Sequence, residues 1–130
     1  MTDKPRKHSA EASISFLARM NAGKEYENII KAFLHMNNVS FKTQVKYKTT
    51  LGIYLADFVL ADGTIVETTQ GDLKKCEGHP FISRKLLKLK ELIAEGKNLL
   101  IVTPNVESWK KRLDCRVIND EQFLNENKQI

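Results

Sequence analysis

The sequence predicts one mixed α/β domain whose elements follow the order helix, three strands, helix, strand and a short helix–strand–helix tail. Three observations predict this class. Apolar residues recur at helical spacing in 24–36 and 82–95. Runs rich in β-branched and aromatic residues, separated by turns, cover 40–70 and indicate an antiparallel meander. The apolar segment 98–103 follows a helix and lacks polar alternation, which is typical of a buried parallel strand.

The N-terminal half begins with a polar, basic stretch. Residues 1–12 predict a flexible basic arm, and 13–130 a single domain that starts with a short helix over 14–20. Asn37-Asn38 ends the helix over 24–36, because Asn tolerates a left-handed C-cap conformation. A strand over 40–48 and a turn at 49–52 then lead into a central hairpin.

The C-terminal half is expected to complete the sheet. Gly96 caps the helix over 82–95, and Pro104 stops the strand over 98–103. The remaining expected elements are a basic helix over 106–113, a strand over 115–118 and a helix over 120–127 with Asp120 as its N-cap.

The central hairpin, residues 54–70, carries two acids that residue counting brings together. It turns at Ala61-Asp62-Gly63, where glycine suits a left-handed position. If Leu60 pairs with Thr64, then Asp57 faces Glu67 across the strands, and like charges so placed destabilise a sheet. A divalent cation such as Mg²⁺ is the simplest reason for the pair. The alternatives are acids that point outward at a sheet edge, or acids that share a proton.

Composition indicates which class of partner and which cellular compartment to expect. The net charge of +5 and the pI near 9.2 favour a polyanionic partner. Two cysteines without a Cys-x-x-Cys pattern indicate reduced thiols in a cytoplasmic setting. The sequence shows no secretory signal and no apolar run long enough to span a bilayer, so we expect no membrane partner.

The sequence contains a helix carrying Glu27, the segment Val39-Ser-Phe41, a strand with Asp57 and the run Ile-Val-Glu67-Thr, with Thr69 two residues after the glutamate. Together these features resemble the PD-(D/E)XK nuclease superfamily. Within it, residues 23–104 look most like phage endonuclease I-type Holliday-junction resolvases. The resemblance implies a restriction-endonuclease-like αβββαβ core, with a mixed central sheet and helices on both faces. It is compatible with a phage-encoded origin.

The same resemblance implies a metal site. Asp57, Glu67 and the backbone carbonyl of Thr68 would bind Mg²⁺ or Mn²⁺, and Glu27 would reach the metal directly or through water. Glu27 shares a helical face with apolar Ile30, so it is expected to point at the sheet. The alternatives are that Glu27 is a surface acid, or that Glu25 takes its place.

Thr69 departs from the family motif, which has a lysine there that polarises the attacking water. A lysine from elsewhere could substitute, a second metal could do its work, or catalysis could have been lost. Strand counting pairs Lys46 with Leu55 and sets Lys46 diagonal to Asp57, so Lys46 is the first candidate. Lys46 could equally be a solvated lysine beside bound DNA.

Other cations suit phosphate contacts, and three of them, Arg84, Lys85 and Lys88, are expected to share a helical face opposite the leucine stripe. That face could also be merely solvated. The full set expected to bind nucleic acid is Lys46, Lys48, Lys74, Lys75, Arg84, Lys85 and Lys88.

The resemblance and the charge together predict a metal-dependent DNA endonuclease that hydrolyses phosphodiester bonds, on branched or otherwise structured DNA. We expect a homodimer or a subunit of a larger DNA-processing complex. The alternative is a catalytically inactive nuclease-fold module that binds DNA or a protein, which Thr69 favours. A basic RNA-binding domain ranks last, because its strands would need interleaved aromatic residues, which this sequence lacks.

Overall fold

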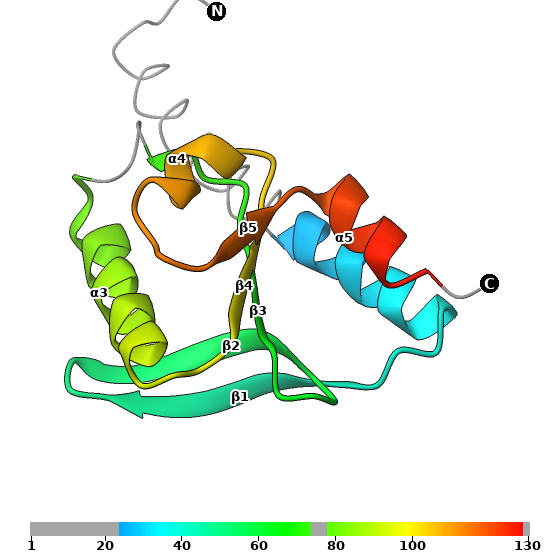
Figure 1. Ribbon diagram of the computed structural model, residues 1–130, viewed down its shortest axis with the longest axis horizontal. Coiled ribbons are helices and arrows are strands. Elements are labelled where there is room, and N and C mark those ends of the chain that lie inside the picture. Colours follow the sequence, from blue (N-terminus) through cyan, green and yellow to red (C-terminus); the bar gives the residue numbers. More distant parts are fainter. Residues whose placement is uncertain (1–23, 74–77, 129–130) are drawn as a thin grey trace, which may run out of the picture.

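The protein folds as a five-stranded mixed sheet with helices on both faces (Figure 1). The computed structural model describes residues 24–73 and 78–128. The strands are β1 (Phe41–Thr49), β2 (Gly52–Leu60), β3 (Ile65–Thr68), β4 (Leu99–Val102) and β5 (Arg116–Ile118), and they lie in the sheet in chain order. The helices cover residues 24–36, α3 (Pro80–Ala94), α4 (Val106–Lys110) and α5 (Asp120–Glu126). The predicted mixed α/β class is confirmed.

The first three strands form the predicted antiparallel meander. At the β2–β3 turn, Gly63 has a φ of 90° and its N–H donates to the Leu60 carbonyl. The Leu60 N–H in turn donates to the Thr64 carbonyl at 2.9 Å. The register therefore follows the count made from the sequence, with the pairs Val59–Ile65 and Phe58–Val66.

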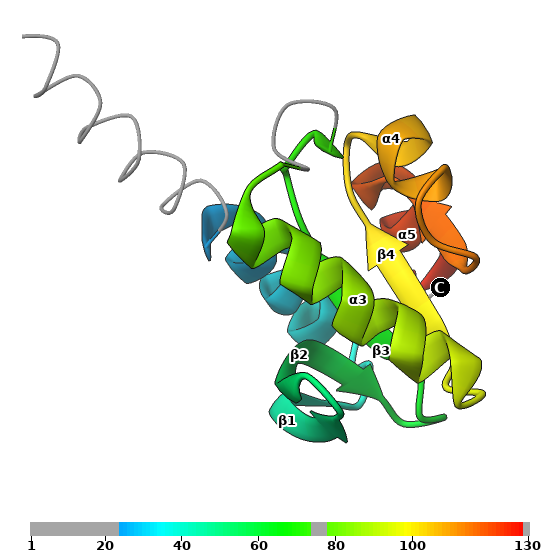
Figure 2. The same cartoon turned by 90° about the vertical axis from the view of Figure 1, so that its left-hand side faces the viewer.

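Parallel pairing extends the sheet through helical connections. Strand β4 pairs in parallel with β3 after α3, and β5 pairs in parallel with β4 after α4. Helix α3 begins at Pro80, where the His79 side chain accepts from the Phe81 N–H, and Gly96 follows its end with a φ of 87°. Figure 2 looks onto this α3 side of the sheet.

Apolar side chains pack into two separate cores, one on each face of the sheet, because successive residues of a strand point to opposite faces. Ile65 and Ile101 pack with α3, α4 and Trp109 on one face. Val66 and Leu100 pack on the other face, under the helix over 24–36 and α5, which lie together in Figure 1. Glu67, which lies on β3, is consequently buried and needs polar partners within the core.

One expected feature of the last helix differs in the structure. The N-cap of α5 is Asn119, whose side chain accepts from the Gln122 N–H at 2.8 Å, so the prediction of Asp120 was wrong by one residue. The predicted arm over 1–12 and helix over 14–20 lie outside the described residues. Among the described residues, the helices are too short and too polar to cross a bilayer.

Candidate active site

Glu67 is a buried carboxylate on β3 that two other elements hold in place. Its exposed fraction is 1%. The Tyr54 hydroxyl on β2 donates to Glu67 Oε1, and the Lys85 ammonium on α3 forms an ion pair with Oε2. Side chains from two neighbouring strands and the helix that covers them therefore meet at one acid.

The protonation of this group follows from burial and charge. Burial raises the pKa of Glu67, and the Lys85 ammonium only partly offsets that effect. Burial lowers the pKa of Lys85, but the negative charge of Glu67 outweighs it, so the pKa of Lys85 lies above its usual value. Burial and then the charge of Glu67 raise the pKa of Tyr54, so its hydroxyl stays protonated and remains a donor.

The Tyr54 hydroxyl can be tested by Tyr54→Phe. We expect the metal-free variant to lose about 1–3 kcal/mol of unfolding free energy, because Glu67 would be left buried with one partner fewer. Urea denaturation measures the loss. The matched control is Tyr47→Phe, since Tyr47 pairs with Tyr54 across β1 and β2 and packs against the same core. An equal loss in both variants would contradict a specific role for the Tyr54 hydroxyl.

Asp57 lies where β2 and β3 separate. The strand ladder ends at the pair Phe58–Val66, so the predicted direct pairing of Asp57 with Glu67 is not made. Instead, Asp57 Oδ2 accepts from the N–H of Thr68 at 2.8 Å and from its Oγ1 at 3.0 Å. The two hydrogen bonds fix the carboxylate beside the end of β3.

A third carboxylate acts on Asp57 from the helix over 24–36. Burial raises the pKa of Asp57 to about 6, although the Thr68 N–H opposes the shift. The negative charge of partly buried Glu27 raises it further, while the charge of Lys85 lowers it. The predicted position of Glu27, facing the sheet and the other acids, is consistent with this effect.

The charges of this group fit a divalent cation. The carboxylates of Glu27, Asp57 and Glu67 face one ammonium, that of Lys85, so two negative charges are uncompensated when all four are ionised. Each carboxylate oxygen has two lone pairs, so the hydrogen bond from Tyr54 leaves Glu67 able to bind a metal.

The ligands are nevertheless few. Within 24–73 and 78–128, no three His, Cys, Asp or Glu side chains form a ready metal-binding group. A cation here would thus be held by one or two carboxylates, with water and phosphate oxygens completing its shell, as is usual for Mg²⁺. Ligation by the Thr68 carbonyl stays a prediction.

Thr69 takes part in the turn that follows β3. Its N–H donates to the Val102 carbonyl at 3.0 Å, and its Oγ1 accepts from the Gly71 N–H at 3.1 Å. The residue at the motif-lysine position therefore has a structural use and brings no charge. The positive charge beside the carboxylates has to come from another element.

The structure places the two candidate lysines differently from the expectation. Lys46 pairs with Leu55 as predicted, but Lys46 is exposed and Leu55 is 45% exposed, so both are on the open side of the hairpin. Lys85, which we expected on a DNA-facing surface, is instead the lysine in contact with Glu67. The expectation that Lys85 shares a face with Arg84 and Lys88, opposite the leucine stripe, was therefore wrong for Lys85.

A sequence signal for Lys85 exists. At 100° per residue, Lys85 lies within about 40° of both Leu89 and Leu92, which are fully buried on α3. A lysine at the centre of an apolar stripe requires a buried anionic partner. The leucine stripe expected from the sequence consists of Ile82, Leu86, Leu89 and Ile93, and its centre lies to one side of Lys85.

The remaining basic residues have separate surroundings. Lys48 and Arg84 are exposed, while the Lys88 ammonium donates to the Ile53 carbonyl at 2.9 Å. Lys74 and Lys75 lie outside the described residues.

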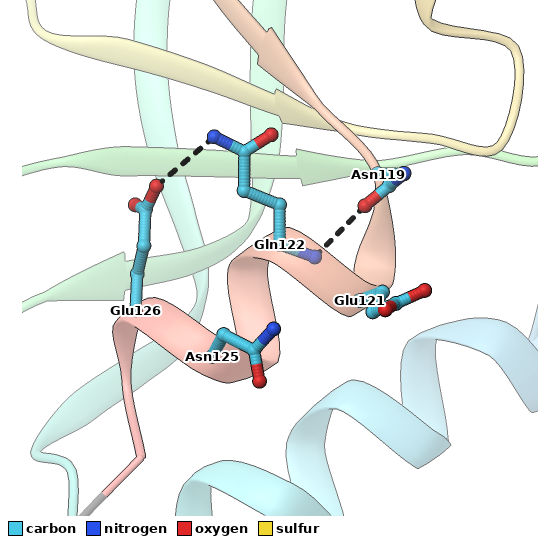
Figure 3. A pocket seen from close by; sticks show the side chains of 5 residues that line it. All are labelled: Asn119, Glu121, Gln122, Asn125 and Glu126. Carbon is cyan, nitrogen blue, oxygen red and sulfur yellow. Dashed lines mark hydrogen bonds between the residues drawn. The ribbon is translucent and has the colours of Figure 1, made fainter.

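A surface hollow on α5 carries no comparable chemistry (Figure 3). It is lined by short polar and acidic side chains, and Gln122 and Glu126 hydrogen-bond to each other at 3.2 Å. Its other lining residues are Asn119, Glu121 and Asn125.

Comparisons with protein-family models, with curated proteins and with solved structures found no match. The function of the chain therefore has to be inferred from the geometry and charge of the group around Glu67.

Proposed function

We propose that the chain is a metal-dependent DNA endonuclease with a restriction-endonuclease-like fold of the PD-(D/E)XK superfamily. The observation that carries the proposal is the meeting of Asp57, Glu67 and Lys85 where β2 and β3 separate, with Glu27 acting from the adjacent helix. The element order also supports it, since a helix, an antiparallel three-stranded meander, a helix and a parallel strand make up the αβββαβ core.

In this proposal, Asp57 and Glu67 would hold Mg²⁺ or Mn²⁺, and Glu27 would reach the cation directly or through water. The bound cation would lower the pKa of a water molecule and neutralise charge on the phosphate. The Thr68 N–H and hydroxyl orient Asp57, and Tyr54 orients Glu67. The water would lose one proton as its oxygen attacks phosphorus, the bond to one deoxyribose oxygen would break, and that oxygen would take up one proton. The net charge of +5 supports salt-dependent attraction to DNA.

The proposal is tested by incubating the protein with linear, supercoiled and four-way-junction DNA in Mg²⁺, Mn²⁺ or EDTA. We expect cleavage with either cation, none in EDTA and none by Glu67→Gln. Tyr47→Phe is the matched control and should cut like the wild type, because it changes a neighbouring residue of the same core without touching a carboxylate. Cleavage that persists in EDTA would contradict a metal-dependent mechanism.

The alternative function has its own outcome in the same experiment. A nuclease-fold module without catalysis would bind these DNAs, with an affinity that falls steeply as salt rises, and would cut none of them. The absence of charge at Thr69 favours this alternative, whereas the charged group around Glu67 argues against it. The expected homodimer or larger complex is tested separately, by measuring the molar mass in solution.

A further inference from the structure

We propose that Lys85 supplies the positive charge that Thr69 cannot, by contacting the phosphate that is cut. This inference rests on the proposed nuclease function. It assigns the catalytic lysine to helix α3, and not to the motif strand or to Lys46 on the hairpin.

The position of Lys85 supports this role. Lys85 points from α3 toward the sheet, and its ammonium is paired with a carboxylate that the proposed chemistry uses. Among residues 24–73 and 78–128, Lys85 is the lysine whose charge acts on both Glu67 and Asp57. Lys46, by contrast, is exposed on the open side of the hairpin.

The solvent exposure of Lys85 also supports this role. The Lys85 side chain is 30% exposed, whereas that of Glu67 is 1% exposed. Lys85 is thus the partner of this ion pair that solvent, and therefore a phosphate, can reach. An ammonium has three N–H donors on a flexible stem, so it can keep the ion pair with Glu67 while donating to a phosphate oxygen.

The competing explanation is that Lys85 only neutralises Glu67 and positions it for the cation. The two roles differ in their response to metal concentration. A lysine that only positions Glu67 would, when lost, change the cation concentration that cleavage needs, but the rate at saturating cation would equal that of the wild type. A lysine that contacts the phosphate would, when lost, lower the rate even at saturating cation.

The experiment compares the wild type with Lys85→Gln, in which an amide can still donate to Glu67 but the charge is gone. Lys90→Gln is the matched control, an exposed lysine on the same helix, and Lys46→Gln tests the alternative lysine. Single-turnover cleavage is measured across a Mg²⁺ series and divided by the folded fraction from circular dichroism. The Mg²⁺-induced shift in melting temperature is measured on the same proteins without DNA.

We expect Lys85→Gln to cut about 10²–10³-fold more slowly at saturating Mg²⁺, since one group that stabilises the transition state is worth about that much. Its melting temperature should still rise with Mg²⁺. Lys90→Gln should cut like the wild type, because Lys90 is an exposed lysine of α3 outside the proposed site. Lys46→Gln should lose far less activity than Lys85→Gln, because the loss of a single phosphate contact among several is modest. Adding Thr69→Lys to Lys85→Gln should restore part of the rate.

Two results would overturn the assignment while leaving the nuclease function intact. One is cleavage by Lys85→Gln at the wild-type rate once Mg²⁺ is saturating. The other is a larger loss in Lys46→Gln than in Lys85→Gln. A wild type that cuts no DNA would overturn the proposed function itself, and the assignment with it, and the Mg²⁺-induced melting shift would then show whether a cation site exists.

Discussion

The replacement Asp57→Asn is expected to make the metal-free protein more stable at neutral pH and to remove most of its stabilisation by Mg²⁺. Asparagine keeps an oxygen that can accept from the Thr68 N–H, so the hydrogen bond that orients the side chain survives. What disappears is a charge buried near Glu67 and Glu27. We therefore expect function to be lost while stability is gained.

The sign of the pH dependence follows from the direction of the shift. Burial, chiefly, raises the pKa of Asp57 from its usual 3.8 to about 6. Between these values the folded chain binds a proton that the unfolded chain does not, so stability from this group falls as pH rises from about 4 to 6. The charged form therefore costs on the order of 1–3 kcal/mol above pH 6, and Asp57→Asn avoids that cost.

Urea denaturation in EDTA at pH 5 and pH 7.5 measures this effect, and melting temperatures with added Mg²⁺ measure the loss of the cation response. The matched control is Asp62→Asn in the β2–β3 turn. Hydrogen bonds from Thr64 lower the pKa of Asp62, so losing that charge should not stabilise the protein. A metal-free Asp57→Asn protein less stable than the wild type at pH 7.5 would contradict a repulsive group of acids.

The second large effect is expected when the buried ion pair is broken from one side. Lys85→Met should reduce the unfolding free energy by about 3–5 kcal/mol, because it leaves the carboxylate of Glu67 buried without its cation. The double variant Glu67→Gln/Lys85→Met removes both charges and should recover most of that loss. Hydrophobic replacement of a whole buried pair is often neutral or stabilising.

Denaturation of the wild type, Glu67→Gln, Lys85→Met and the double variant completes a double-mutant cycle. A coupling energy near zero, with the double variant as unstable as the sum of the single variants, would show that Lys85 and Glu67 do not depend on each other. Metal-free conditions are required, since a bound cation would also pair with Glu67.

Much of the scaffold could be predicted from local signals. The turn at Gly63 set the β2–β3 register by counting, and the apolar run before Pro104 identified β4 as a buried parallel strand. Counting failed at Asp57 because the Thr68 N–H bonds to a side chain there, which ends the ladder one pair early. Residue counting assumes that the ladder of backbone hydrogen bonds continues, and it does not predict a side chain that accepts from a backbone N–H of the neighbouring strand.

The site could be predicted only in part, for a related reason. The acids Asp57 and Glu67 follow from a pattern along adjacent strands, whereas Lys85 comes from a helix that follows them in the chain. Its relation to Glu67 depends on how α3 packs across the sheet. Lys46 was favoured because its register was known, but register does not say which side of the hairpin the helix covers. Here α3 covers the side of Tyr54, and Lys46 is on the other.

Strand β1 is one of the two outer strands of the sheet among the described residues, and it is nine residues long. A long free edge invites pairing with the edge of another molecule, and lysines along it discourage this by mutual repulsion. Lys42, Lys46 and Lys48 are all exposed on β1. Lys46 and Lys48, which could attract DNA, would then also help to keep the protein from aggregating. Removing all three lysines at once would favour aggregation through the exposed edge of β1.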